Sequence, residues 1–423
     1  TREALELGQD QVVTITPDSV TVVDFDGGPA QGRAYTVDWD ASAAVQGGFA
    51  RYFPDQRTLI LDSDGGSSDG TAEVVAQASI GDPATLLARH PLRTVHRIVT
   101  PYHGIPGKGS ALRTVFGAAA MLGARACAVV DSDLRSITPE WIELLVSPVL
   151  RERFDFVAPL YHRHKYDGTI TNAIVYPLTR ALYGLRVRQP IGGDFGFSGR
   201  LAEHFLDHDV WGSDVARFGI DIWMTTTAIV GGFRVCQSFL GAKIHDAKDP
   251  GVDLSAMLTQ VVSSVLSLMG THRAAWNGVD GSAPVPTFGF EYTVGLEPVN
   301  VNVERMLGIF RTGVRELGSV WERALAPATL HQVRAIATAA DGEFRFPPEA
   351  WVRTVYDIAC AFHAAGVNRD HLLRSLVPLY LGRTASFVRE AHDADATEVE
   401  AILEALCRKY EELKPYLVQR WSS

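Results

Sequence analysis

The most constraining feature of this chain is the alternation of strand-like and helix-like segments through its first half. Short apolar runs typical of strands occupy residues 58–61, 126–130, 154–160 and 233–239, and residues 114–122 have a helical pattern. Strands that alternate with helices predict an α/β fold with a mainly parallel sheet and helices on both of its faces. In such sheets, ligands bind beyond the carboxyl ends of the strands. Polar residues that follow a strand are therefore the first candidates for a site.

The second half of the chain has a different pattern. Apolar residues keep a helical spacing over 254–268, 303–314, 351–362 and 399–410, and Asp395 or Thr397 is placed to cap the last of these helices. Residues 270–298 are rich in Gly, Pro and Thr and are expected to form a connecting loop. We therefore predict an α/β domain over residues 1–250 and a mainly α-helical region over 251–423.

Composition excludes several classes of partner. The 39 Lys and Arg against 49 Asp and Glu give a net charge of −10, which argues against a nucleic acid or an anionic membrane surface as partner. No apolar run of about 18 residues and no signal-peptide pattern is present, so we expect a cytoplasmic protein without a membrane span. The four cysteines form no CxxC pair and are expected to be buried thiols.

Two carboxylates follow the second strand-like run, in the segment Asp131-Ser132-Asp133. Aspartates one residue apart at a strand end can bind a hard divalent cation such as Mg²⁺ or Mn²⁺, which also bridges phosphate oxygens. Alternatively, one aspartate binds the cation and the other a sugar hydroxyl. A solvated turn would have the same sequence, so the segment alone does not decide.

A lysine between two glycines and a distant histidine extend this pattern. Lys108 lies in the segment PGKGS, where glycine lets the backbone approach an anion, the ammonium offsets phosphate charge, and Ser110 is placed to start a helix. His245 follows a strand-like segment, and a neutral imidazole is a good ligand for Mn²⁺. An ordinary turn and a structural histidine are the competing interpretations.

Two further carboxylates lie beside glycine, Asp194 in GGD and Asp221 in GID. Such groups accept hydrogen bonds from sugar hydroxyls, although each segment alone fits a surface turn equally well. The order of these motifs is more informative than any one of them. An acidic strand end, a GKG loop, a DxD, a GGD, a GID and a histidine together indicate a nucleotide-sugar site.

This order of motifs resembles the retaining GT-A glycosyltransferases that make mannosylglycerate and glucosyl-3-phosphoglycerate. The resemblance covers roughly residues 58–415. The segments that carry it are PGKGSA at 106–111, VVDSDL at 129–134, QPIGGD at 189–194, GID at 219–221 and AKIH at 242–245. The resemblance implies a GT-A domain that transfers a hexose from GDP-mannose or UDP-glucose to a small hydroxy acid such as D-glycerate. The product would be mannosyl- or glucosylglycerate, which are compatible solutes.

The resemblance also implies roles for the residues that match these motifs. On the donor side, Lys108 contacts the diphosphate, Asp131 the ribose or the sugar, and Ser63 the base. Asp133 and His245 hold the divalent cation, Mn²⁺ or Mg²⁺. Asp194 and Asp221 are the predicted catalytic carboxylates, which bind sugar or acceptor hydroxyls.

The acceptor side departs from the glucosyl-3-phosphoglycerate synthases. Those enzymes hold the acceptor phosphate with an arginine, and Thr169 stands at that position here. An unphosphorylated acceptor such as glycerate therefore fits better. Thr169, Thr171 and Asn172 are the candidate acceptor contacts, and Arg163 is expected to pair with the acceptor carboxylate.

Retention of configuration is expected to come from attack on the same face that the diphosphate leaves, because no residue stands out as a nucleophile. Asp194 is the one carboxylate to test in that role. Two other functions remain open at this point. One is a nucleotidyltransferase, and the other is a non-catalytic protein that binds nucleotide sugars on a decayed GT-A fold. A homodimer is possible.

Overall fold

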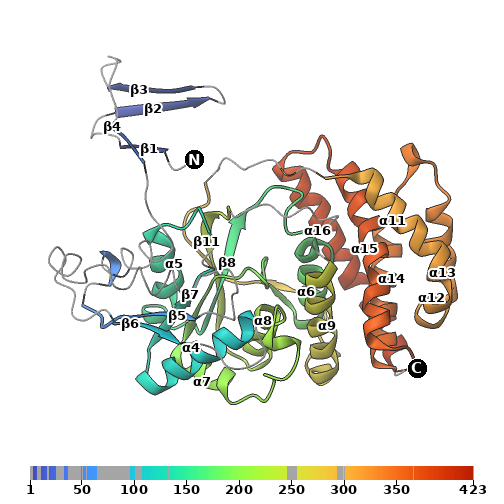
Figure 1. Ribbon diagram of the computed structural model, residues 1–423, viewed down its shortest axis with the longest axis horizontal. Helices are drawn as coiled ribbons and strands as arrows, with labels where there is room; N and C mark the ends of the chain where they lie inside the picture. Colours follow the sequence, from blue (N-terminus) through green and yellow to red (C-terminus); the bar gives the residue numbers. More distant parts are fainter. Residues whose placement is uncertain are drawn as a thin grey trace.

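The computed structural model describes residues 3–6, 11–16, 19–24, 33–36, 49, 51–53, 55–63, 96–100, 107–131, 134–244, 255–292, 299, 301–364 and 366–422. An α/β body with a mixed sheet occupies the middle of the molecule, and helices form one end of it (Figure 1). The predicted α/β class with a helical C-terminal region is confirmed. Within the described ranges, no helix combines the length and the apolar composition that crossing a bilayer requires.

Five strands form the central sheet in the order β13-β11-β8-β10-β7. β11 pairs in parallel with β8 and β13, whereas β10 is antiparallel to both β8 and β7. The sheet is therefore mainly parallel, as predicted, apart from β10, which the sequence did not indicate. The strands are β7 (Ala126–Val129), β8 (Phe156–His162), β10 (Phe195–Ser198), β11 (Val235–Ala242) and β13 (Thr287–Phe288).

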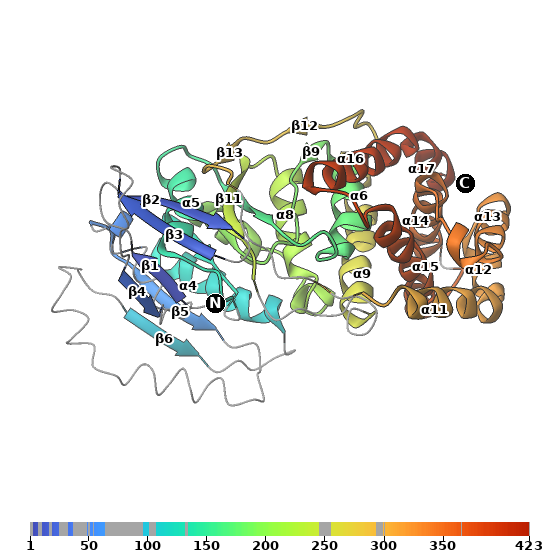
Figure 2. The same ribbon diagram turned by 90° about the horizontal axis from the view of Figure 1, so that it is seen from above.

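Four smaller two-stranded sheets are also present among the described residues. β5 (Leu59–Ser63) and β6 (His96–Thr100) pair in parallel next to the α/β body, and β9 (Leu185–Arg186) pairs with β12 (Ala283–Pro284). Near the N-terminus, β1 (Glu3–Glu6) pairs with β4 (Arg33–Thr36) and β2 (Gln11–Thr16) with β3 (Ser19–Asp24). Seen from above, the C-terminal helices lie on one side of the α/β body, and the N-terminal strands lie over its other side (Figure 2).

Successive side chains of a strand point to opposite faces of the sheet. Both faces of this sheet carry apolar side chains, and helices cover both of them. On β8, Phe156 and Ala158 enter the main core, whereas Val157 and Tyr161 join the smaller core beneath α5. The helices of the α/β body are α4 (Lys108–Leu122), α5 (Pro139–Leu150), α6 (Tyr176–Tyr183), α7 (Gly199–Leu206) and α8 (Ile220–Val230).

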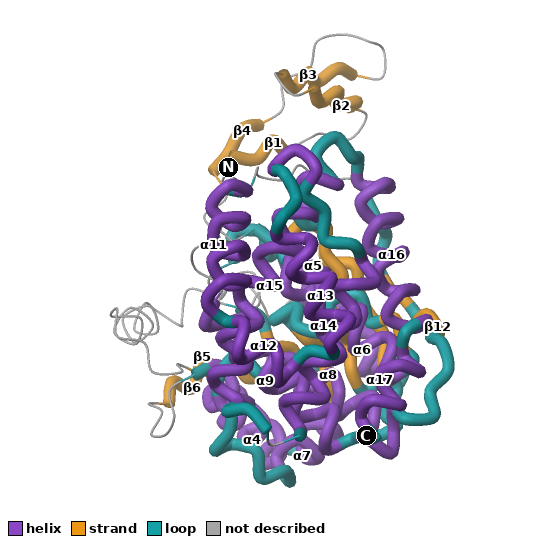
Figure 3. The backbone as a smooth tube through the Cα atoms, turned by 90° about the vertical axis from the view of Figure 1, so that its right-hand side faces the viewer, coloured by secondary structure: helices purple, strands orange, loops and turns teal. Residues whose placement is uncertain are grey.

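The helical region follows residue 254 and includes all four helices that the apolar spacing predicts (Figure 3). The pattern did not indicate α12, α13, α15 or α17. The helices are α9 (Ser255–Thr271), α10 (Arg273–Trp276), α11 (Val303–Glu316), α12 (Gly318–Ala324), α13 (Pro327–Ala337), α14 (Pro348–His363), α15 (Arg369–Glu390), α16 (Ala396–Glu412) and α17 (Lys414–Trp421).

The segment expected to be a connecting loop, residues 270–298, contains more structure than predicted. It holds α10 and the short strands β12 and β13, and β13 forms the edge of the central sheet. The prediction was wrong here because two-residue strands are too short to show a side-chain pattern. Backbone groups make this edge instead, as in the 2.9 Å hydrogen bond from Gln237 N to Pro286 O.

One apolar core joins the α/β body to the helical region. The same cluster includes Leu112 of α4, Phe156 of β8 and Tyr410 of α16. An ion pair reinforces this junction, because the Arg180 side chain, only 1% exposed, lies 2.5 Å from Glu404 and 2.8 Å from Glu411. The division near residue 250 stays a prediction, and the packing across it is continuous.

Candidate active site

Charged side chains from five segments meet at one edge of the central sheet. Asp131 follows the end of β7, and Lys243 follows the end of β11. Asp194 directly precedes β10, which runs in the opposite direction, so its start lies at the same edge. Lys108 is the first residue of α4, and Asp221 lies in the first turn of α8. This is the edge at which open α/β sheets bind their ligands.

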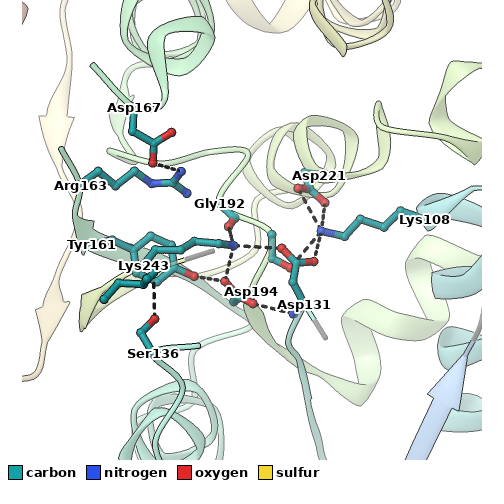
Figure 4. Close-up of polar contacts among 12 residues, drawn as sticks. Lys108, Asp131, Ser136, Tyr161, Arg163, Asp167, Gly192, Asp194, Asp221 and Lys243 are labelled. Carbon is teal, nitrogen blue, oxygen red and sulfur yellow. Dashed lines mark hydrogen bonds and ion pairs between the residues drawn. The ribbon is translucent and has the colours of Figure 1, made fainter. Parts of the chain in front are cut away.

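Asp131 lies between two lysines (Figure 4). Lys108 Nζ donates to its Oδ1 over 2.8 Å, and Lys243 Nζ donates to its Oδ2 over 2.9 Å. Lys108 also lies 3.2 Å from the Asp221 carboxylate and donates to the carbonyl oxygen of Gly193. We call Lys108, Asp131, Asp194, Asp221 and Lys243 the five-charge cluster.

Asp194 is the buried end of this cluster and has no exposed surface. Its Oδ1 accepts a 2.8 Å hydrogen bond from the backbone N–H of Asp131. Its Oδ2 accepts from Lys243 Nζ over 2.8 Å and from the hydroxyl of Tyr161. With three donors and no contact with solvent, the carboxylate of Asp194 is positioned to hold Asp131 and Lys243 in place.

The charges in the cluster change one another's protonation. Burial alone would raise the pKa of Asp131, but Lys108 and Lys243 outweigh it and hold that pKa well below its usual range. Burial would likewise lower the pKa of Lys108, and the carboxylates of Asp131 and Asp221 raise it instead. Asp131 and Lys108 therefore remain charged at neutral pH.

The two remaining carboxylates are affected mainly by burial. Burial raises the pKa of Asp194, and the charge of Lys243 opposes this effect. Burial also raises the pKa of Asp221, against the charge of Lys108. Tyr161 stays protonated because burial, followed by the charge of Asp194, raises its pKa well above the ordinary value. The Tyr161 hydroxyl is thus held as a hydrogen-bond donor to Asp194.

Glycine is required where backbones approach the cluster. Gly193 has φ +92°, and a Cβ at this position would collide with the Asp131 carboxylate and lie 2.9 Å from Lys243 Nζ. In the GKG segment, a Cβ on Gly109 would collide with the carbonyl group of Val215. Gly109 therefore serves helix packing, which differs from the anion approach that the sequence suggested for it.

Ser110 also differs from its predicted role. Helix α4 begins at Lys108 with Gly107 as its N-cap, so Ser110 lies inside the helix. Its hydroxyl donates a 3.3 Å hydrogen bond to the carbonyl oxygen of Ala216. The helix therefore begins two residues earlier than the sequence suggested, at Lys108. Ser110 helps to pack α4 against the turn before α8.

The predicted acceptor residues lie in one segment after β8, and most of them have partners within the protein. Arg163 pairs with Asp167 over 3.2 Å, and its guanidinium lies 5.4 Å from the ring of Tyr161. The buried Thr169 hydroxyl lies 2.5 Å from the hydroxyl of Tyr380. Asn172 accepts from Arg188 over 2.9 Å. Thr171 is the first residue of a π-helical turn, Thr171–Val175.

Arg163 approaches the five-charge cluster through the ring of Tyr161 and makes no direct contact with the cluster itself among the described residues. Lys243 Nζ lies 5.4 Å from the same Tyr161 ring, so both cations share one aromatic neighbour. The structure therefore places Arg163 of the predicted acceptor segment and Lys243 of the cluster against the same aromatic ring.

The structure describes the predicted base contact, Ser63, but not the two predicted metal ligands. Ser63 ends β5, and its hydroxyl donates a 2.9 Å hydrogen bond to the carbonyl oxygen of Ala111 in α4. Asp133 and His245 lie outside the described residues. Within the part of the chain that the structure describes, no three His, Cys, Asp or Glu side chains gather as a metal site.

The described residues next to these two predicted ligands are hydrogen bonded to each other. Arg135 N donates to Ile244 O over 2.9 Å, and Ile244 N donates to the Ser136 hydroxyl over 3.0 Å. The segments that follow β7 and β11 are therefore tied side by side.

Lys243 and Tyr161 are the site residues that the sequence analysis missed. Lys243 stands in the AKIH segment that was singled out for its histidine, and a lysine directly after a strand end was a usable signal. Tyr161 lies in β8 among apolar residues, where a tyrosine is usually a core residue. Only its hydrogen bond to Asp194 reveals a role in the site.

No protein-family model matches the chain. Among curated proteins, the glutamine–fructose-6-phosphate aminotransferase of Streptomyces coelicolor is 48% identical over 75 residues, which are 17% of this chain and 12% of that protein. The enzyme of the same name from Corynebacterium glutamicum is 39% identical over 103 residues, 23% of this chain and 16% of that protein. The chain thus spans less than a fifth of the length of these two relatives.

The chain is also similar to solved structures of glucosyl-3-phosphoglycerate synthase from Mycobacterium tuberculosis. The complex with Mn²⁺, UDP-glucose and phosphoglyceric acid has 24% identity and a TM-score of 0.38, covering 55% of this chain and 76% of that one. The complex with Mg²⁺ and UDP has 25% identity, a TM-score of 0.38 and the same coverage. These synthases are one of the two groups of GT-A enzymes that the motifs of the chain resemble.

Proposed function

We propose that this protein is a metal-dependent, retaining glycosyltransferase that moves a hexose from a nucleotide-diphosphate sugar to a small hydroxy acid. The observation that carries the proposal is the position of Asp131 between Lys108 and Lys243 at the carboxyl edge of the sheet. Because Lys108 is a partly exposed ammonium group fixed where such a sheet binds its ligand, the edge suits a diphosphate. GDP-mannose and UDP-glucose are the proposed donors, and D-glycerate is the proposed acceptor.

Lys108 and Asp131 are the members of the cluster that are open to a donor. Their side chains are 24% and 28% exposed, whereas that of Lys243 is only 5% exposed. We assign Lys108 to the diphosphate and Asp131 to the ribose or the sugar, with Ser63 near the base. Lys108 would stabilise the charge that develops on the leaving diphosphate. Asp221, which shares Lys108, is placed to accept a hydrogen bond from a sugar hydroxyl.

We place a divalent cation beside the cluster, with Asp133 and His245 as its proposed ligands. Two features support this choice. The hydrogen bonds that Ile244 makes to Arg135 and Ser136 tie together the segments from which the two ligands come. Asp131 has an ammonium within 3 Å of each carboxylate oxygen, which opposes a cation there and leaves that role to Asp133. When bound, the cation would supply Lewis-acid stabilisation of the phosphate oxygens.

Same-face attack remains the proposed route to retention. A covalent intermediate on Asp194 fits poorly, because its carboxylate has no exposed surface and is occupied by three donors. We therefore assign Asp194 to positioning Asp131 and Lys243. The acceptor hydroxyl would attack the anomeric carbon from the side that Arg163 and the segment after it occupy.

The acceptor is proposed to carry a carboxylate and no phosphate. Arg163 shares the ring of Tyr161 with Lys243 of the cluster, and it is balanced by one carboxylate, Asp167. Lys165 and Arg188 are already bound, to backbone carbonyls and to Glu400 respectively. Thr169 is buried against Tyr380 and adds no charge.

The test is a product assay on the purified protein with Mn²⁺ and with Mg²⁺. Each donor, GDP-mannose and UDP-glucose, is paired with D-glycerate, D-lactate and 3-phosphoglycerate, and products are identified by mass spectrometry. Formation of a hexosyl acid supports the proposal, and retained α configuration by NMR supports its stereochemistry. Release of pyrophosphate with a nucleotidyl product indicates a nucleotidyltransferase, and binding without turnover indicates a non-catalytic protein.

A further inference from the structure

The segment that carries the predicted acceptor contacts is fastened to the helical region at several points. We call residues 163–172 the acceptor loop, and we call residues 387–403, where α15 ends and α16 begins, the α15–α16 corner. The loop belongs to the α/β body, since it follows β8, whereas the corner lies more than 200 positions later in the chain.

The first fastening point is Lys165. Its ammonium donates to three backbone carbonyl oxygens beyond the last turn of α15, those of Ala391 over 2.8 Å, His392 over 2.7 Å and Ala394 over 3.2 Å. A cation at a helix C-terminus is also favoured by the helix dipole. All three protons of the ammonium are used, so Lys165 fixes the acceptor loop and is not available to a ligand.

The second fastening point is Tyr166. Its ring packs against the small apolar cluster of the corner, formed by Phe387, Ala391, Val399 and Leu403. Its hydroxyl donates a 3.3 Å hydrogen bond to the carbonyl oxygen of Val388. Lys165 Nζ lies 5.5 Å from the centre of the same ring, so the two fastening points support each other.

The far end of the loop is held by the same two helices. Thr169 contacts the hydroxyl of Tyr380, which lies inside α15. Asn172 accepts from Arg188, whose guanidinium also pairs with Glu400 of α16 over 2.8 Å. Arg163, by contrast, donates to Asp167 within the loop, and the Asp167 carboxylate also accepts from the N–H of Gly168. The loop is thus fixed at both ends, with the Arg163–Asp167 pair presented from its first half.

We propose that the α15–α16 corner positions the acceptor loop, and that Lys165 and Tyr166 are positioning residues which set how Arg163 meets the acceptor acid. The inference rests on the proposed function, because it takes the acceptor to bind at this loop. In this arrangement the helical region contributes to acceptor recognition without touching the acceptor. The donor residues Lys108 and Asp131 come from other segments and do not depend on the corner.

Only acceptor binding is proposed to depend on the corner, so acceptor binding and donor binding are measured separately. Lys165→Met removes the ammonium and keeps most of the side-chain length, and Lys165→Arg restores a cation. Tyr166→Phe removes only the hydroxyl. Lys409→Met is the matched control, because Lys409 is a lysine on α16 that pairs only with Glu412 among its described contacts. Initial rates are measured against acceptor and against donor, with calorimetric titration of the nucleoside diphosphate as an independent measure of donor binding.

Lys165→Met is expected to raise the acceptor KM about tenfold, in line with the loss of charge-assisted hydrogen bonds. The donor KM and the nucleoside diphosphate Kd are expected to stay within about twofold, as all parameters do in Lys409→Met. Lys165→Arg should recover part of the loss, and Tyr166→Phe should give a smaller effect. An unchanged acceptor KM in Lys165→Met, or donor and acceptor parameters that rise together, would overturn the proposal.

Hydrogen exchange measured by mass spectrometry tests the anchor without any substrate. In Lys165→Met, amides of the acceptor loop should exchange about tenfold faster, while those of α4 stay as in the wild type. If the wild type transfers no sugar but this loop-specific change occurs, the proposed function fails and the anchor stands. Unchanged exchange in the loop would overturn the anchor, whatever the activity.

Discussion

At the scale of single residues, the site consists of a small number of charged side chains, each of which is paired with a group of opposite charge. Asp131 receives an ammonium at each oxygen, and Asp194 receives three donors although it has no exposed surface. Buried charges of this kind are tolerated only when each has a partner with good geometry. The five-charge cluster therefore acts as a unit, in which loss of one member leaves others unpaired.

Lys243 is the member whose loss should affect stability most. Lys243→Met removes an ammonium that is only 5% exposed and leaves Asp131 and the buried Asp194 without their shared partner. Breaking a buried pair from one side costs about 3–5 kcal/mol in the free energy of unfolding. Chemical denaturation of the variant against Lys409→Met checks this value, and a loss below about 1 kcal/mol would mean that the cluster tolerates the unpaired carboxylates.

Lys108 is the member whose loss should affect ligand binding most, because it is partly exposed. Lys108→Ala is expected to weaken binding of the nucleoside diphosphate by about 1–3 kcal/mol, the range for a lost charge-assisted hydrogen bond. Calorimetric titration with UDP and GDP in the presence of Mn²⁺ measures the change. Equal affinities in variant and wild type would remove Lys108 from the donor site.

At the scale of helices and strands, the sequence predicted the elements that have a long, regular pattern. Strands β5, β7, β8 and β11 and helices α9, α11, α14 and α16 all lie where apolar spacing indicated. β10 was missed because a four-residue strand after GGD shows only two large apolar residues, Phe195 and Phe197. Helix α15 was missed because most of its positions are buried and Pro378 interrupts the pattern, so no single apolar face stands out.

The site was predictable to a similar degree. The sequence order identified Lys108, Asp131, Asp194 and Asp221, and the structure brings these four together. It did not identify Tyr161, whose role depends on a contact with a residue 33 positions away that only the folded sheet creates. Lys243 was inside a recognised segment, but its partners also come from separate strands.

The contact of α6 with α16 should make stability depend on pH. Hydrogen bonds from Arg180, against a smaller effect of burial, lower the pKa of Glu404 from 4.5 to about 2. A carboxylate with a lowered folded pKa stabilises the fold above its unfolded pKa, and this contribution is lost as pH falls from about 4.5 towards 2. The Glu404 side chain is 34% exposed, so solvent screening limits the effect to about 1–2 kcal/mol.

Glu404→Gln should therefore be less stable than the wild type by about this amount at pH 7, with the difference shrinking as the pH falls below about 4.5. Denaturant unfolding at a series of pH values measures the two curves. Curves that stay parallel down to pH 2.5 would show that the ion pair with Arg180 does not carry the effect.

At the scale of the whole molecule, the α/β body and the helical region share one core. Helix α9 packs against α8, and β13, which comes after α9 in the chain, completes the edge of the sheet. The apolar pattern alone could not show this, because it marks where a helix has an apolar face but does not show what that face contacts.

A chain that ends at residue 250 should therefore not fold as an independent domain. It would expose the apolar surfaces of α6 and α8 that Leu258, Val262 and Tyr410 cover in the full chain. We expect the fragment to lack a cooperative thermal transition by near-ultraviolet circular dichroism, whereas the full chain shows one. A sharp transition in the fragment would support a separable domain over residues 1–250.

The central claim is that Asp133 and His245 hold one divalent cation beside the five-charge cluster. Electron paramagnetic resonance of Mn²⁺ with the protein alone tests it most directly, because Mn²⁺ bound to the protein loses the six-line signal of the free ion. We predict that the wild type and His331→Ala, which changes an exposed histidine on α13, remove the free signal, whereas folded Asp133→Ala and His245→Ala do not. Mn²⁺ binding in both variants at the wild-type level would contradict the account.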